Sequence, residues 1–231
     1  LASAGLKTVR LPIGVNADDL STLVLDLGVI SHLLVAGPSQ SGRSTLLRTW
    51  ARSLAATESA EECRIYVIDS KRNSLAPLRA LVHVAGYACD PQESDALLRA
   101  VNASIGEMQQ NRRAGLPTPR ITILIDDLWE TYDDTVSSDG KDLVGRLISD
   151  GRGLPFHLLV GGRLSDLASK SWAEPVKSLK EGQCGIVLGT GDDALFNTRL
   201  SFQERNRSLP VGEGYYIQRG LVQRVKIAVS D

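Results

Sequence analysis

Cysteine is scarce in this sequence of 231 residues, which contains only Cys63, Cys89 and Cys184. An odd number of cysteines without a C-x-x-C spacing argues against a disulfide framework and against a zinc site. The pattern favours a reducing compartment, and we expect the three cysteines to be small buried residues.

Clusters of positive charge are also missing. Lysine and arginine total 26 against 27 acidic residues, the formal net charge is −1, and no run of basic residues stands out. A protein that binds bulk DNA or an anionic membrane commonly presents a strongly basic surface. The charge balance therefore argues against DNA as a partner.

Long apolar runs are absent as well. No stretch approaches the ~20 residues that a helix needs to cross a bilayer, and the first residues have no signal-peptide pattern. Hydrophobic residues nevertheless make up 42% of the chain, which is enough for one large core. We expect residues 1–231 to form a single domain without a membrane segment. Because the sequence begins at Leu1 rather than Met, we expect it to be excised from a longer chain.

Short runs of β-branched and aliphatic residues alternate with helical patterns along the sequence. Continuous apolar runs such as HLLVA and ITILI indicate strands buried on both faces, as in a parallel sheet. The clearest helix is predicted over Pro91–Arg113, with Asp90 as its N-cap and Glu93 three residues beyond the cap. The alternation predicts an α/β fold with a largely parallel sheet, helices on both faces, and ligands at the carboxyl ends of the strands. Strands are predicted at 32–36, 64–68, 121–125, 157–160, 185–188 and 221–229, and further helices at 44–54 and 141–149.

The stretch GPSQSGRST follows a predicted strand and opens a predicted helix, which is the pattern of a phosphate-binding P-loop. Gly37 and Gly42 allow backbone N–H groups to surround a phosphate, and the helix N-terminus adds its positive dipole end. Gln40 and Ser41 are expected to present amides to the β-phosphate, and Ser44 to offer its hydroxyl to Mg²⁺. The alternative is a Gly/Ser-rich turn without a ligand. The predicted ligands are ATP and Mg²⁺, and the predicted nucleotide-binding residues are Gly37, Ser39, Gln40, Ser41, Gly42, Arg43, Ser44 and Thr45.

Two carboxylates follow another predicted strand, in ITILIDDLWE. Asp126 ends that strand at the position from which a Walker B carboxylate holds a water molecule of the Mg²⁺ coordination shell. Asp126 and Ser44 therefore form the predicted metal site. Asp127 stands where hydrolytic P-loop enzymes usually have Glu to orient the attacking water. A misplacement of about 1 Å can cost on the order of a hundredfold in rate. The alternative is a pair of acids that simply end a strand.

Arg43 occupies the position of the P-loop lysine. A guanidinium keeps the positive charge but is planar and bulkier, and its donors are fixed in a fork. Nucleotide binding can survive this exchange through the backbone and Mg²⁺, whereas transition-state stabilisation requires a charge placed at the developing oxyanion. Arg43 and Asp127 together predict a domain that holds ATP and hydrolyses it weakly or not at all. Asp127 stays the candidate catalytic residue, and the sequence leaves open whether the domain is an enzyme.

Several segments in the same order resemble the FtsK/SpoIIIE family of P-loop ATPases: LPIG, HLLVAG, ITILIDD, GRGLPFHLLVGGR and LPVGEGYYIQRG. The resemblance is closer to the tandem ATPase domains of the type VII (ESX) secretion motor EccC. In the family the last of these segments contains Pro-Pro-Gly-Arg-Gly, from which Val211 and Glu213 depart. The departures at Arg43 and Asp127 fit a later domain, the second or third of the tandem.

This resemblance implies a RecA/FtsK-like P-loop NTPase domain in a membrane-anchored motor on the cytoplasmic side of the plasma membrane. The implied partners are adjacent ATPase domains and the C-terminal signal of an exported WXG100-type protein, for which Trp129, Trp172 and Phe196 are apolar candidates. Arg163 falls near the position of a γ-phosphate sensor in related ATPases. Arg152 is a candidate arginine finger toward a neighbouring domain, and the alternative is a solvated loop arginine. The alternative is a hydrolytic FtsK-type translocase that acts on DNA or protein with help from neighbouring subunits.

Overall fold

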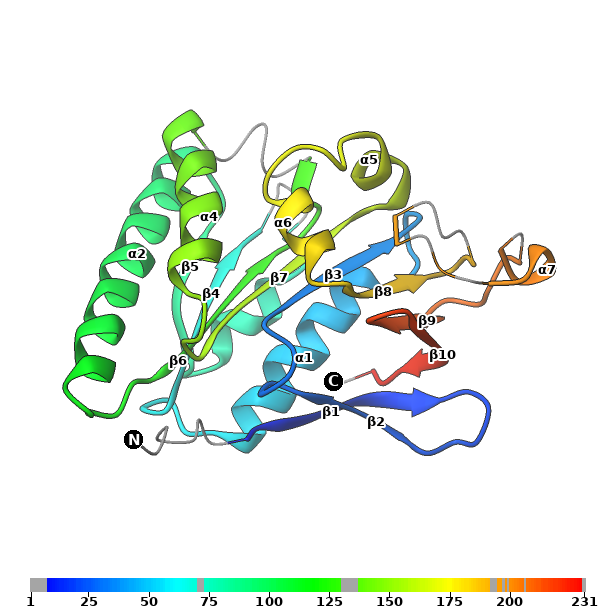
Figure 1. The fold of residues 1–231 in the computed structure, drawn as a ribbon, viewed down its shortest axis with the longest axis horizontal. Coiled ribbons are helices and arrows are strands. Elements are labelled where there is room, and N and C mark those ends of the chain that lie inside the picture. Colours follow the sequence, from blue (N-terminus) through cyan, green and yellow to red (C-terminus); the bar gives the residue numbers. More distant parts are fainter. Residues whose placement is uncertain are drawn as a thin grey trace.

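A ten-stranded mixed sheet with helices on both faces forms the domain (Figure 1). The computed structural model describes residues 8–69, 73–129, 137–191, 195–196, 198, 200–205 and 207–229. The strands are β1 (Arg10–Asn16), β2 (Thr22–Asp26), β3 (His32–Gly37), β4 (Cys63–Ile68), β5 (Val84–Ala88), β6 (Arg120–Ile125), β7 (Phe156–Arg163), β8 (Cys184–Leu188), β9 (Glu213–Gln218) and β10 (Leu221–Ile227). The helices are α1 (Arg43–Thr57), α2 (Pro91–Arg113), α4 (Ser138–Asp150), α5 (Leu164–Ser169), α6 (Val176–Glu181), α7 (Phe202–Arg205) and the 3₁₀ helix η1 (Ala76–Ala80).

The sheet has a parallel part and an antiparallel part. Its strand order is β2-β1-β10-β9-β8-β3-β7-β6-β4-β5. Strands β8, β3, β7, β6, β4 and β5 pair in parallel, whereas β9, β10, β1 and β2 extend the sheet beyond β8 by antiparallel pairs. The predicted α/β fold with a largely parallel sheet and helices on both faces is therefore confirmed.

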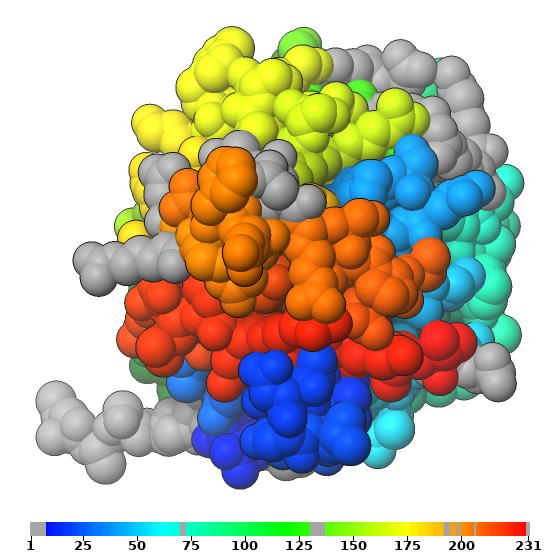
Figure 2. Space-filling model, turned by 90° about the vertical axis from the view of Figure 1, so that its right-hand side faces the viewer, coloured from blue at the N-terminus to red at the C-terminus, as the bar shows by residue number. Residues whose placement is uncertain are grey.

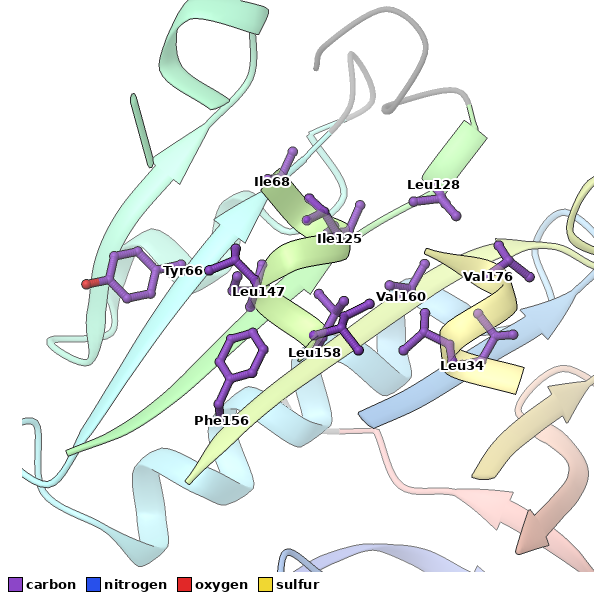
Figure 3. Close-up of a cluster of buried hydrophobic side chains, with 14 of the residues drawn as sticks. Leu34, Tyr66, Ile68, Ile125, Leu128, Leu147, Phe156, Leu158, Val160 and Val176 are labelled. Carbon is purple, nitrogen blue, oxygen red and sulfur yellow. The ribbon is translucent and has the colours of Figure 1, made fainter. Parts of the chain in front are cut away.

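The central strands are buried on both faces, as their apolar runs predict. In β3, Leu34 and Ala36 belong to one buried cluster, whereas Leu33 and Val35 belong to the other. Side chains of α2 and α4 complete the first cluster, and side chains of α1 complete the second. Figure 3 shows Leu147 of α4 above the inward-facing residues of β4, β6 and β7. Two cores thus hold the sheet between its helical layers.

Helix α2 has the boundaries that its sequence predicts. The Asp90 carboxylate accepts a hydrogen bond from the Glu93 backbone N–H at 2.9 Å, and Pro91 is the first helical residue. Helix α1 runs three residues beyond the predicted end, and α4 begins three residues before the predicted start because Ser137 caps it. The apolar stripe of α2 is buried, as expected for a helix that packs on a sheet: Leu97, Leu98, Val101, Ile105 and Met108.

The expectation of three buried cysteines is wrong for one of them. Cys63 and Cys184 are buried, and burial raises their pKa values to about 12 and about 11. Cys89 is only half-buried because it lies between strand β5 and the N-terminus of α2 at the edge of the sheet. Among the described helices, none has the length and apolar character of a membrane span.

Candidate functional site

The P-loop lies at the carboxyl end of β3, between β8 and β7. Strand β3 ends at Gly37, and α1 begins at Arg43 with Gly42 as its N-cap. A Cβ on Gly37 would lie 2.6 Å from both the Leu188 carbonyl oxygen and Ser41 Oγ. Gly42 has a φ of 103°, which side chains rarely tolerate. Glycine is therefore required at both ends of the loop, which leaves the backbone free to curve in front of the α1 N-terminus.

Ser44 and Asp126 come together from two elements. The Ser44 hydroxyl donates a hydrogen bond to Asp126 Oδ2 at 2.7 Å, and Asp126 directly follows β6 and is 3% exposed. The other Asp126 oxygen accepts the Asp127 backbone N–H at 3.0 Å. A hydroxyl beside a carboxylate is an oxygen donor set of the kind that Mg²⁺ prefers. These two residues fit a magnesium ion that takes its other ligands from phosphate and water.

The described residues were also compared with the side-chain clusters that hold other metal ions. Among the described residues, no three His, Cys, Asp or Glu side chains converge in a group that could hold a metal ion. The histidines instead serve the fold, since His83 Nε2 bonds to the Glu58 carbonyl at 2.8 Å and His157 Nδ1 to the Ser31 carbonyl at 3.0 Å.

Arg43 and Asp127 form a buried ion pair inside the site. Arg43 Nη2 lies 3.4 Å from Asp127 Oδ2, and the two side chains are 8% and 7% exposed. Arg43 Nη1 also donates to the Gly37 carbonyl oxygen at 3.2 Å. The guanidinium therefore links the first residue of the P-loop to the end of β6. Arg43, at the position of the P-loop lysine, therefore pairs with Asp127, at the position expected to orient the attacking water.

The predicted site residues, apart from Gly37 and Ser41, are divided between two cavities. A cavity of about 270 Å³ is slightly smaller than the ~300–1,000 Å³ that is typical of ligand pockets. A second cavity of about 970 Å³ is lined by Pro38, Ser39 and Arg163, among others. The smaller cavity is the candidate site, because residues of the predicted phosphate loop and both aspartates meet there. Its described lining is Gln40, Gly42, Arg43, Ser44, Thr45, Ser74, Asp126, Asp127 and Val211.

Arg163 does not line the cavity that contains Arg43 and the two aspartates. It ends β7 and contributes to the larger cavity, together with Ser39 from the first half of the loop. A sensor role for Arg163 stays a prediction. Arg152 precedes β7 at the opposite, amino-terminal edge of the sheet, so it does not belong to the P-loop site of its own chain.

Sequence reasoning missed Ser74 and Val211, which line the smaller cavity. Ser74 is held in place because its carbonyl accepts Arg48 Nη1 at 3.1 Å and the next residue, Leu75, donates its N–H to Asp69 at 2.9 Å. Val211 belongs to the Pro-Val-Gly-Glu-Gly segment, whose resemblance to a family motif does not show where the segment lies relative to the P-loop. That segment was the only signal in the sequence that could have indicated Val211.

The three apolar candidates for partner recognition have different environments. Trp129 and Phe196 pack partly buried against the core beneath α2 and α4. Trp172 is 76% exposed, in the turn between α5 and α6. Of these three, Trp172 alone presents its ring to solvent.

Comparison with known proteins agrees with this geometry. The model of the FtsK/SpoIIIE family matches residues 6–116, which include the P-loop. The EccC protein of the ESX secretion system of Thermomonospora curvata is 25% identical over 238 residues, which cover 95% of this chain. The chain contains an FtsK/SpoIIIE domain. The ESX-4 protein EccC4 of Mycobacterium tuberculosis is 29% identical over 224 residues, which cover 90% of the chain.

This FtsK/SpoIIIE domain is homologous to ATPase domains of EccC proteins, and it spans 17% of the length of each of these two relatives. A solved structure described as Thermomonospora curvata EccC (ATPases 2 and 3) in complex with a signal sequence peptide superposes with a TM-score of 0.81 at 22% identity. The match covers 100% of this chain and 42% of the other. The likeness shows the same P-loop NTPase fold.

Proposed function

We propose that this FtsK/SpoIIIE domain holds ATP and hydrolyses it weakly or not at all, as one ATPase-like domain of a longer type VII secretion motor. The observation that carries the proposal is the ion pair between Arg43 and Asp127. In a hydrolytic site the positive group faces the β- and γ-phosphates and the acidic group orients the attacking water. Here the two groups neutralise each other at 3.4 Å, with less than a tenth of either side chain exposed.

The loop residues supply binding without those two groups. The backbone of Gly37, Ser39, Gln40, Ser41 and Gly42, with the N-terminus of α1, would surround the phosphates through N–H groups and the helix dipole. Ser44 and Asp126 would hold Mg²⁺, and Thr45 lies beside them in the cavity wall. When bound, Mg²⁺ would neutralise charge on the phosphate oxygens. Most of the predicted binding machinery is thus independent of Arg43.

Catalysis depends more strongly on placement than binding does. A planar guanidinium engaged with both Gly37 and Asp127 is fixed in direction, so it is poorly placed to follow charge that develops on a transferring phosphoryl group. Asp127 has a short side chain and is drawn toward Arg43. Both features weaken transition-state stabilisation while the phosphate cradle is retained.

The place of the domain in a motor is part of the same proposal. The two relatives described above are named as ESX secretion proteins, and the superposed solved structure contains a signal sequence peptide. We therefore propose a later position, second or third, among tandem ATPase domains on the cytoplasmic side of a membrane-anchored secretion complex. Its partners would be the neighbouring ATPase domains and the C-terminal signal of a WXG100-type substrate.

The test begins with the nucleotide. Purified protein is denatured, the released nucleotide is identified by chromatography, and ATP turnover is measured at defined Mg²⁺ for the wild type and for the Arg43→Lys, Asp127→Glu double reversion. We expect stoichiometric intact ATP in the wild type and at least about tenfold faster turnover in the reversion. The reversion combined with Ser44→Ala is the control, and it should return turnover to background.

Two results would contradict the proposal. A double reversion without any gain would show that Arg43 and Asp127 are not what limits hydrolysis. A wild type that hydrolyses ATP in many turnovers, well above the background set by the Ser44→Ala control, would support the alternative, a hydrolytically active translocase.

A further inference from the structure

One apolar side chain stands in the wall of an otherwise polar site. Of the described residues that line the 270 Å³ cavity, Val211 alone is apolar, and it is 70% exposed. A single exposed valine on a protein surface requires no explanation. This one differs because it shares a cavity wall with Gln40, Thr45 and the two aspartates, where polar side chains would be expected.

The backbone fixes Val211 relative to the phosphate-binding loop. The N–H of the next residue, Gly212, donates to the Ser41 carbonyl oxygen at 2.9 Å, and the Gly212 carbonyl accepts the Ile227 N–H at 2.8 Å. A Cβ on Gly42 would lie 3.3 Å from Gly212 Cα, so the two backbones are in close contact. The segment before β9 and the P-loop accordingly lie side by side at the surface (Figure 2). The backbone at Val211 is therefore fixed relative to the P-loop.

The chemistry of a nucleotide matches this arrangement. Its phosphates are anionic and suit the N–H groups of the loop, whereas its base presents flat faces that pack against apolar groups. We infer that Val211 is the contact surface for the base of the nucleoside triphosphate held by the P-loop. This inference rests on the proposed nucleotide-holding function and adds the position of the base to it.

The inference makes Val211 a residue that distinguishes a nucleotide from its bare phosphate chain. Methyl groups packed against a flat base contribute through apolar area, and this contribution is absent for tripolyphosphate. The Val211→Ala substitution removes both γ-methyl groups and should weaken nucleotide binding about three- to tenfold. The affinity for tripolyphosphate should not change, because the loop itself is intact.

The experiment compares two ligands on three proteins. Isothermal titration calorimetry measures the affinity of MgATP and of magnesium tripolyphosphate for the wild type, Val211→Ala and Val82→Ala, after any co-purified nucleotide has been removed by chelation and dialysis. Val82 is a matched control, since it is an 82% exposed valine that precedes β5 at the opposite edge of the sheet. Thermal unfolding without ligand checks that all three proteins fold equally.

The expected result is weaker MgATP binding for Val211→Ala alone, with tripolyphosphate affinity equal in all three proteins. Unchanged affinity for both ligands in Val211→Ala would overturn the inference. Equal weakening for both ligands would also overturn it, because Val211 would then act on the loop through Gly212 rather than on the base. Wild-type protein that binds neither ligand would overturn the proposed function itself, and with it this inference.

Discussion

Arg43 brings a permanent positive charge into a site where 8% of its side chain remains exposed. A buried charge without a partner costs several kcal/mol, because the protein interior solvates it poorly. Asp127 supplies the counter-charge from 84 residues further along the chain. The two departures from the P-loop pattern are therefore physically coupled, and a change in one alters the environment of the other.

Coupling of this kind is measurable by a double-mutant cycle. Asp127→Asn removes the counter-charge, and the amide tolerates the φ of 48° at this position. We expect it to lower the free energy of unfolding by about 1–3 kcal/mol, because Arg43 stays buried with a weaker partner. With Arg43→Met added, the loss should be clearly smaller than the sum of the single losses in urea unfolding.

The more exposed pair between Arg224 and Glu213 provides the comparison. Its nitrogen and oxygen lie 2.9 Å apart, but its side chains are 29% and 16% exposed. Its coupling energy should be no more than about 1 kcal/mol, because solvent screens the pair. Strictly additive effects at Arg43 and Asp127 would show that the buried pair contributes no coupling.

At the scale of elements, the antiparallel extension of the sheet reaches back to the phosphate loop. The turn before β9 contacts the loop through the hydrogen bond from Gly212 to Ser41, and Gly189 after β8 donates its N–H to the Glu213 carbonyl at 2.8 Å. The loop is thus supported by two strand ends as well as by its own glycines. A change in the turn should therefore alter the affinity of the candidate site for nucleotide.

Two glycines allow this to be tested with equal backbone strain. Gly212 and Gly220 have φ values of 79° and 82°, and a Cβ on either would meet nothing closer than 3.9 Å. Alanine at each position should therefore cost about 1–2 kcal/mol of stability for the same conformational reason. We expect Gly212→Ala alone to weaken MgATP binding in calorimetry, since Gly220 lies in the turn between β9 and β10. Equal affinities in both variants would show that the turn does not support the loop.

At the scale of the whole molecule, the candidate site and a buried network of polar side chains lie at opposite ends of the parallel strands. The P-loop and the two aspartates lie at the carboxyl ends of the parallel strands. At the amino ends, Arg120 pairs with Glu58 at 2.9 Å and bonds to His157 Nε2 at 2.8 Å. Glu58 is the C-cap residue of α1, so one helix connects the candidate site to the buried polar network.

That network predicts how stability depends on pH. Burial, and then the nearby Arg120, lowers the pKa of His157 to about 3, while burial and Arg152 lower the pKa of His32 to about 4. Unfolded histidine titrates near pH ~6.5. Between these values the unfolded chain binds more protons than the folded chain. The stabilisation is therefore present above about pH 6.5 and is lost as the pH falls.

Urea unfolding between pH 6.5 and 5 measures this effect. Each histidine should contribute a loss of up to about 1.4 kcal/mol per pH unit in that window. His157→Gln lowers the number of protons taken up on unfolding, so its slope should be clearly shallower than that of the wild type. A wild-type stability that does not fall across this window would contradict the assignment.

The sequence by itself determined those features that depend on neighbouring residues. The boundaries of α2, six of the ten strands of the sheet and the strand–loop–helix around Gly37 and Gly42 follow from local periodicity, capping and turn chemistry. Strands β1 and β2 went unpredicted because their residues are buried largely in alternation, and β5 because its run contains Gly86 and is incompletely buried. Strand β9 also went unpredicted, because its short apolar run lies between Gly214 and Gln218.

Tertiary structure alone decided what meets in the site. The pairing of Arg43 with Asp127, the approach of Val211 to the P-loop and the placement of Arg163 in a different cavity all depend on strand order and register. A local sequence pattern carries no information about which distant strand ends become neighbours. The sequence therefore specified the chemical groups, and the packing of the sheet specified their partners.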